Sequence, residues 1–257
     1  MDPIKTFFGF LFFILSTQLY ADVITLRTDL WCPYACDPKS DKPGFMIEIA
    51  REIFEKHGHS VDYDVLNWAR AIDEVKMGKY NGLVGCSKFS SESEGLEFPN
   101  IANGVNTNFY WAPKESTWFY ESPEILKNKK IGIVKSYSYG STTDALIKAN
   151  HKSFINVTGN MPLLRMIQMT ESKRLDGFLE NPYVLARALK VNHKDPELFR
   201  MASANLSDQT ELFIAFSAGH PKSKTYTKLL DAGMIELRKS GRLKVILERY
   251  GMTDWKK

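Results

Sequence analysis

Aromatic, hydroxyl and acidic side chains recur in this sequence in short loops that directly follow apolar, strand-like stretches. Such residues could hold a small molecule, because aromatic faces contact a flat or cationic group, hydroxyls make hydrogen bonds and carboxylates bind a cation. In open α/β sheets, ligands bind outside the carboxyl ends of the strands. The loops are 29–34, 67–70, 86–94, 135–141 and 180–183, with the candidates Trp31, Tyr34, Trp68, Arg70, Ser87, Glu92, Ser136, Tyr137, Ser138 and Glu180.

Each of these candidates also has a purely structural interpretation. Trp31 and Tyr34 could pack over a surface loop, and Trp68 could belong to the core. Arg70 fits a solvated helix face, although it could also reach a ligand anion. The 135–141 segment could start a helix or form a carboxylate cradle. The serine- and glutamate-rich stretch 85–98 could be an ordinary solvated loop.

We find no catalytic constellation. The sequence has no GxSxG elbow, no HExxH motif and no glycine-rich phosphate loop, and none of the five histidines lies in the nominated loops. Glu92 and Glu180 could face each other as an acid pair, but nothing else supports general acid–base chemistry. We therefore predict a protein that is not an enzyme, with no metal and no cofactor.

Strands and helices alternate along the chain and must position these loops. Strands are predicted at 23–28, 60–66 and 81–86, and a second series at 130–134, 153–157, 176–180, 198–202 and 211–217. A helix ending at Gly58 places on one face Met46, Ile49, Ala50, Ile53 and Phe54.

Repeated β-α units indicate an α/β protein with two open, mainly parallel layers joined by right-handed crossovers. The segment 106–116 is strand-like and is then broken by a proline, and it marks the boundary between the two series of β-α units. The strand at 211–217 could return to the first layer. We expect lobe 1 to comprise residues 22–110 and 212–257, and lobe 2 to comprise 111–211. Such a bilobed body closes around a ligand by hinge bending.

The composition is that of an ordinary globular protein, and the net charge of +4 is scattered, so a nucleic-acid partner is not indicated.

Residues 1–21 combine a lysine, an apolar run at 7–15 and a small residue at Ala21, which is typical of a cleaved signal peptide. A membrane anchor is the alternative, although the apolar run is short. We predict a secreted, periplasmic protein.

Two cysteines, Cys32 and Cys36, lie in a compact loop, where an oxidising compartment favours a disulfide. Metal binding is a rival interpretation, but no second Cys/His pair has ligand spacing. A thiol-redox pair fits less well because the spacing is not CxxC. Cys86 falls on an apolar strand and is predicted to be a buried free thiol.

The ordered set of segments from about Val23 to Gly251 resembles the family 3 extracellular solute-binding proteins, the periplasmic components of polar amino-acid ABC uptake systems. The resemblance implies a type II periplasmic-binding-protein (venus-flytrap) fold with two hinge strands. It also implies a monomer that delivers a small-molecule ligand to a membrane permease. The matching segments are "LRTDLWCPY", "GFMIEIAREIFEKHG", "WARAIDEVKMGKYNG", "LEFPN", "KKIGIVKSYSYG", "RLDGFLENP" and "LRKSGRLKVILERYG".

The family grips the α-carboxylate of its ligand with an arginine after the third strand and the α-ammonium with an aspartate in the second lobe. By resemblance these positions correspond here to Glu92 and Asn181, with Glu180 beside the latter. A ligand carboxylate facing Glu92 would lose a bidentate ion pair. A cationic, amine-bearing or aromatic-stacking solute fits better, unless the alignment slips or Lys88 or Arg70 substitutes for the arginine.

Two further functions stay open. Some secreted proteins that resemble this family are cyclohexadienyl or arogenate dehydratases, in which a cleft carboxyl group acts as general acid, and Glu92 or Glu180 could serve in that way. A soluble sensor component that presents its ligand to a membrane receptor is the other alternative.

Overall fold

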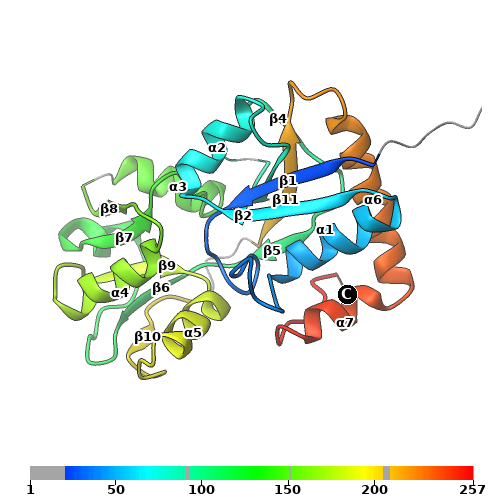
Figure 1. Ribbon diagram of the computed structural model, residues 1–257. Coiled ribbons are helices and arrows are strands. Elements are labelled where there is room, and N and C mark those ends of the chain that lie inside the picture. The colour runs from blue at the N-terminus through cyan, green and yellow to red at the C-terminus, as the bar shows by residue number, and fades with distance from the viewer. Residues whose placement is uncertain (1–20, 89, 91–92, 151, 205–208, 257) are drawn as a thin grey trace, which may run out of the picture.

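Two lobes, each built on its own β-sheet, make up the protein (Figure 1). The computed structural model describes residues 21–88, 90, 93–150, 152–204 and 209–256. Residues 1–20 of the predicted signal peptide and Glu92 lie outside the described residues. Within the described part of the chain, no helix is long and apolar enough to cross a membrane.

The sheet of lobe 1 has the strand order β2-β1-β3-β11-β4, and β5 also pairs with β11. β1 is parallel to β2 and to β3, whereas β11 is antiparallel to each strand it contacts. The prediction of a mainly parallel layer is therefore correct for β2, β1 and β3, and the returning strand β11 runs the opposite way. The strands are β1 Val23–Thr28, β2 Ser60–Val65, β3 Gly82–Cys86, β4 Leu96–Glu97, β5 Gly104–Asn106 and β11 Thr210–Ser217.

The sheet of lobe 2 has the order β10-β6-β9-β7-β8. β7 is parallel to β8 and β9, and β6 is antiparallel to β9 and β10. The strands are β6 Phe109–Pro113, β7 Ile131–Val134, β8 Phe154–Val157, β9 Gly177–Glu180 and β10 Phe199–Met201.

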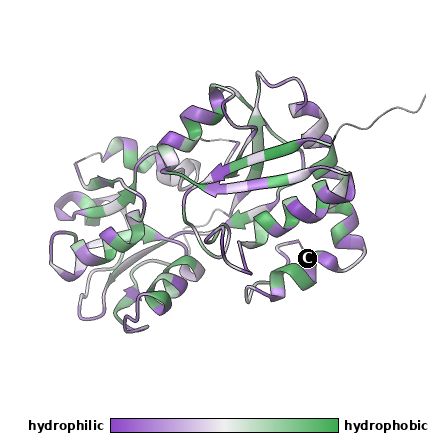
Figure 2. Ribbon diagram, in the orientation of Figure 1, coloured by the Kyte–Doolittle hydropathy of each residue, from purple (hydrophilic) through white to green (hydrophobic). Residues whose placement is uncertain are grey.

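Helices cover both sheets, and their apolar faces form the cores. Figure 2 shows hydrophobic residues running along the strands, while polar residues gather on loops and outward helix surfaces. The helices are α1 Phe45–Lys56, α2 Trp68–Lys76, α3 Ser141–Ala149, α4 Pro162–Glu171, α5 Pro182–Val191, α6 Ser223–Lys239 and α7 Arg242–Glu248, with the 3-10 helix η1 Pro123–Asn128.

Helix α1 has the buried stripe that its spacing predicts, since Met46, Ile49, Ala50 and Phe54 are all fully buried. It starts immediately after Gly44, whose φ is 114° and whose Cβ, if present, would lie 2.4 Å from the Tyr34 carbonyl oxygen. Only glycine accommodates that close approach. This contact fixes the cysteine loop against the first turn of α1.

The cysteine predictions are confirmed. Cys32 and Cys36 form a disulfide, and Cys86 is a buried free thiol at the end of β3. The chain crosses between the sheets twice, once between β5 and β6 and once between β10 and β11.

Candidate functional site

Four of the five nominated strand-end loops, all but 180–183, meet between the two lobes around a small cavity of about 30 Å³. That volume holds one or two water molecules. The lining comes from the ends of β1, β3 and β7, from the first residue of α2 and from both strands of the β5–β11 pair. The lining residues are Thr28, Asp29, Trp31, Trp68, Val84, Gly85, Ser87, Ser90, Asn106, Ser136, Tyr137, Ser138 and Leu212.

A buried carboxylate, Asp29, lies in this cavity directly after β1 and is only 2% exposed. The hydroxyl of Tyr137, from lobe 2, donates a hydrogen bond to Asp29 Oδ2. Among the described residues that line the cavity, none carries a positive charge. Asp29 is thus an acid whose partner is a neutral phenol from the opposite lobe.

Three aromatic rings enclose this part of the cavity. Tyr137 presents its ring edge-on to Trp31, at 6.2 Å between centroids, and to Trp68, at 5.6 Å. Tyr34 stacks on the far side of Trp31 at 4.1 Å. The rings therefore form a wall around Asp29, and Tyr137 fills the space between them.

A second buried carboxylate, Glu180, lies at the end of β9 and is 3% exposed. Its Oε1 accepts hydrogen bonds from Trp31 Nε1 at 3.3 Å and from the backbone N–H of Asn181 at 2.7 Å. Glu180 therefore lies behind the indole of Trp31 and orients it, whereas Asp29 faces the cavity directly.

Burial raises the pKa values of both acids. Desolvation raises the pKa of Asp29 to about 6, against the opposing hydrogen bond from Tyr137. Desolvation, with a smaller contribution from the charge of Asp29, raises the pKa of Glu180 to about 7 against the opposing hydrogen bonds from Asn181 and Trp31. The charge of Asp29 thus makes Glu180 harder to ionise, as expected for two acids in a poorly solvated site.

The lobes touch each other around the cavity. Trp68 Nε1 donates to the Ser136 carbonyl oxygen at 2.9 Å, and Asn67 Nδ2 donates to the Gly159 carbonyl oxygen at 3.0 Å. Together with the Tyr137–Asp29 and Trp31–Glu180 hydrogen bonds, these contacts hold the two lobes together, so the cleft is closed. A solute larger than one or two waters must displace Tyr137 or separate the lobes.

The structure brings most of the nominated residues together. Ser87, Ser136 and Ser138 line the cavity with Trp31, Trp68 and Tyr137. The Ser138 hydroxyl donates to Asp144 at 2.6 Å, which ties it to the start of α3.

Besides Glu180, which lies behind Trp31, three nominated residues do not line the cavity, and a further one cannot be placed. Arg70 is on the outer side of α2, where its Nε donates to Glu74 Oε1 at 2.9 Å. Tyr34 is buried behind Trp31, and its hydroxyl donates to the Val105 carbonyl oxygen at 2.7 Å. Asn181 caps α5 and donates to Asn106 and Thr107 at the crossing between the lobes. Glu92 lies outside the described residues.

Asp29 was not among the nominated residues, although it begins one of the nominated loops. A carboxylate immediately after the last residue of a strand is the signal that could have identified it, by the same strand-end rule that selected Trp31. The sequence alone does not show that Asp29 points into the cleft rather than into solvent.

Ionisation of these acids should lower the stability of the protein. A folded-state pKa above the ordinary value means that the folded state holds its proton more tightly. The stabilising contribution is therefore complete at low pH and is lost as the pH rises towards about 6 for Asp29 and about 7 for Glu180. Thr28 and Tyr137 hydrogen-bond to Asp29 and partly offset this effect.

We predict that Asp29→Asn gains stability over the wild type as the pH rises from about 5 to about 8. The gain should be about 1–2 kcal/mol across this range, because the amide cannot ionise. Urea unfolding at both pH values measures it. Asp73→Asn, which removes an exposed carboxylate on α2, is the control and should show the same offset at both pH values. A pH-independent offset for Asp29→Asn would contradict the prediction.

The sequence matches no protein-family model and no curated protein. The fold, in contrast, is similar to many solved structures. One is a histidine kinase sensor domain with similarity to periplasmic binding proteins, with a TM-score of 0.74 and 17% identity over 89% of this chain and 95% of the other.

Two further similar structures hold arginine. An ancestral arginine-binding protein bound to arginine has a TM-score of 0.71 and 19% identity, covering 90% of this chain and 98% of the other. An amino-acid ABC transporter substrate-binding protein from Streptococcus pneumoniae, bound to L-arginine, has a TM-score of 0.70 and 18% identity, covering 90% and 94%. The predicted two-lobed periplasmic-binding-protein fold is therefore confirmed.

Proposed function

We propose that the protein is a periplasmic solute-binding protein that captures a small cationic solute in the interlobe cleft and delivers it to the permease of an ABC uptake system. One observation carries the proposal. Asp29 and Glu180 are buried at the closed cleft, and no cation lines the cavity among the described residues.

A bound cation would offset the free-energy cost of burying these two carboxylates. The raised pKa values of both acids reflect the cost of holding a charged carboxylate away from water. An ammonium or guanidinium group would make a charge-assisted hydrogen bond with the ionised Asp29, worth about 1.5–3 kcal/mol. The faces of Trp31 and Trp68 would add cation–π attraction of about 0.5–2 kcal/mol each. A carboxylate would instead face two acids.

The similar structures support the class of function and of solute. Two of them bind arginine, whose side chain is a cation. Delivery to a permease, export to the periplasm through cleavage after Ala21 and a monomeric state are parts of the proposal that follow from the class of protein.

A thermal-shift screen of the mature protein tests this function. The screen compares amino acids, polyamines and neutral osmolytes near pH 7.5. We expect amine-bearing solutes to raise the melting temperature, because a ligand that binds only the folded state stabilises it by mass action. A screen in which acidic and neutral solutes stabilise the protein and amines do not would contradict the proposal.

A cleft enzyme of the cyclohexadienyl or arogenate dehydratase type is the second candidate. The observation that favours it is the Glu180 carboxyl group, because a pKa of about 7 suits a general acid at neutral pH. Against it, Glu180 is engaged by Trp31 and by the N–H of Asn181, and the cavity lining described here holds no cation to grip an acidic substrate. Incubation with prephenate or arogenate, followed by the absorbance of the aromatic product, distinguishes the two functions.

A further inference from the structure

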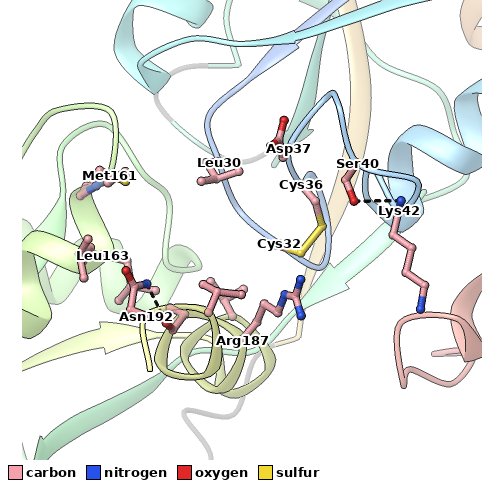
Figure 3. A pocket seen from close by; sticks show the side chains of 15 residues that line it. Leu30, Cys32, Cys36, Asp37, Ser40, Lys42, Met161, Leu163, Arg187 and Asn192 are labelled. Carbon is pink, nitrogen blue, oxygen red and sulfur yellow. Dashed lines mark hydrogen bonds between the residues drawn. A yellow bond between two sulfur atoms is a disulfide. The ribbon is translucent and has the colours of Figure 1, made fainter. Parts of the chain in front are cut away.

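A second hollow, much larger than the cleft cavity, lies between the disulfide loop of lobe 1 and helices α4 and α5 of lobe 2. Its volume is about 410 Å³, within the range of small-molecule sites. Figure 3 shows it with Leu30 and the disulfide on one side, Met161 and Leu163 on another, and α5 below. We call it the disulfide groove.

The lining of the disulfide groove is mainly apolar and unusually exposed. Leu30 is 42% exposed, Met161 57% and Val191 50%, and they come from three separate segments of the chain. Single exposed apolar residues are ordinary, but several around one concave surface indicate a site that something covers.

Positive charge lies at the edge of this apolar surface. Arg187 extends from α5 towards Cys32 (Figure 3), and no carboxylate within salt-bridge distance of it is found among the described residues. Lys42 also lines the groove, and the one acceptor found for its Nζ among the described residues is the Arg249 carbonyl oxygen, at 3.3 Å. Asp37 is the one acid in the described lining. An adjoining hollow shares Arg187 and Lys42 and adds Lys190.

From this combination we propose that the disulfide groove binds a small amphipathic anion, an aliphatic carboxylate whose tail lies against Leu30, Met161 and Val191 and whose carboxylate is gripped by Arg187. The planar guanidinium binds a carboxylate through two parallel hydrogen bonds, which an apolar surround strengthens. Because both lobes contribute to the lining, a bound anion bridges them. This site goes beyond the cationic solute of the cleft and does not depend on it.

Isothermal titration calorimetry with decanoate, below its micelle concentration, tests this site. We expect one decanoate per protein with a dissociation constant below about 1 mM. Decylammonium, which has the same tail and the opposite charge, should bind at least about tenfold more weakly.

Variants locate the site. Arg187→Gln should weaken decanoate binding at least about tenfold, because it removes the charge from an exposed side chain without disturbing the core. Ala188→Phe should block the groove. Lys224→Gln, a matched loss of charge on α6, should leave binding unchanged. So should Asp29→Asn, because the amide can still accept the hydrogen bond from Tyr137 that joins the lobes.

Three results would overturn the proposal. One is the absence of saturable decanoate binding, and another is equal affinity for wild type and Arg187→Gln. The third is binding of an acidic amphipathic peptide or of anionic vesicles without binding of decanoate. Since Asp29→Asn separates the two sites, failure here is distinguishable from failure of the proposed cleft function.

Discussion

Asp29→Asn is expected to lower the affinity for a cationic solute about a hundredfold, which corresponds to about 2.7 kcal/mol. The reason is that Asp29 is the described carboxylate that faces the cleft cavity, and it is buried where solvent screens its charge poorly. The amide keeps the size of the side chain and can still accept the hydrogen bond from Tyr137. Isothermal titration calorimetry of wild type and variant with the best amine from the screen gives the ratio.

Two other substitutions serve as comparisons for the effect of Asp29→Asn on affinity. Glu180→Gln should have a smaller effect, about tenfold, because Glu180 lies behind Trp31 and acts through its indole and through longer-range attraction. Asp73→Asn should have none, since this carboxylate is exposed on α2. If Asp29→Asn binds the amine as tightly as the wild type, the cleft does not use Asp29 to hold a cation.

Tyr137→Phe is expected to have the opposite effect and to raise the affinity for the amine about tenfold. In the closed cleft the Tyr137 hydroxyl holds the carboxylate that the solute needs, so an entering cation must first break that bond. The phenyl ring keeps the edge-on contacts with Trp31 and Trp68 while removing the competitor. The measurement is the same titration, with the dissociation rate followed by stopped-flow fluorescence of the tryptophans.

The Tyr137 prediction has a definite contrary outcome. A loss of affinity in Tyr137→Phe would mean that the hydroxyl contacts the solute after closure rather than competing with it. Tyr183→Phe, which removes the hydroxyl of a half-exposed tyrosine on α5, is the matched control and should leave the affinity unchanged.

The fold could be predicted in nearly all its elements. Alternation along β2 and the stripe on α1 are local patterns, and each is imposed by burial of one face. The return of the strand at 211–217 to the first sheet was predicted, but its antiparallel direction and the short strands β4 and β5 were not. These strands pair with partners far away in the chain, so the short-range periodicity of the sequence does not predict the pairing.

The candidate site could be predicted only in part. The strand-end rule places Trp31, Trp68 and Tyr137 correctly at the cleft. The rule fixes where a loop lies, but it does not fix the direction of each side chain. The Arg70 side chain therefore points to Glu74 on its own helix. The Asn181 side chain caps α5 and donates hydrogen bonds to the segment that crosses between the lobes. Asp29 and the contact with Tyr137 depend on closure of two lobes, which no local pattern encodes.

Comparing lysine with cadaverine distinguishes a cation-selective cleft from one that recognises an α-carboxylate. Lysine and cadaverine share the same diamine chain and differ only by the α-carboxylate. If the cleft holds its solute through Asp29 and Glu180, titration near pH 7.5 should show cadaverine binding at least about tenfold more tightly than lysine. Tighter binding of lysine would show that the cleft recognises an α-carboxylate, and it would contradict the account of a cation-selective site.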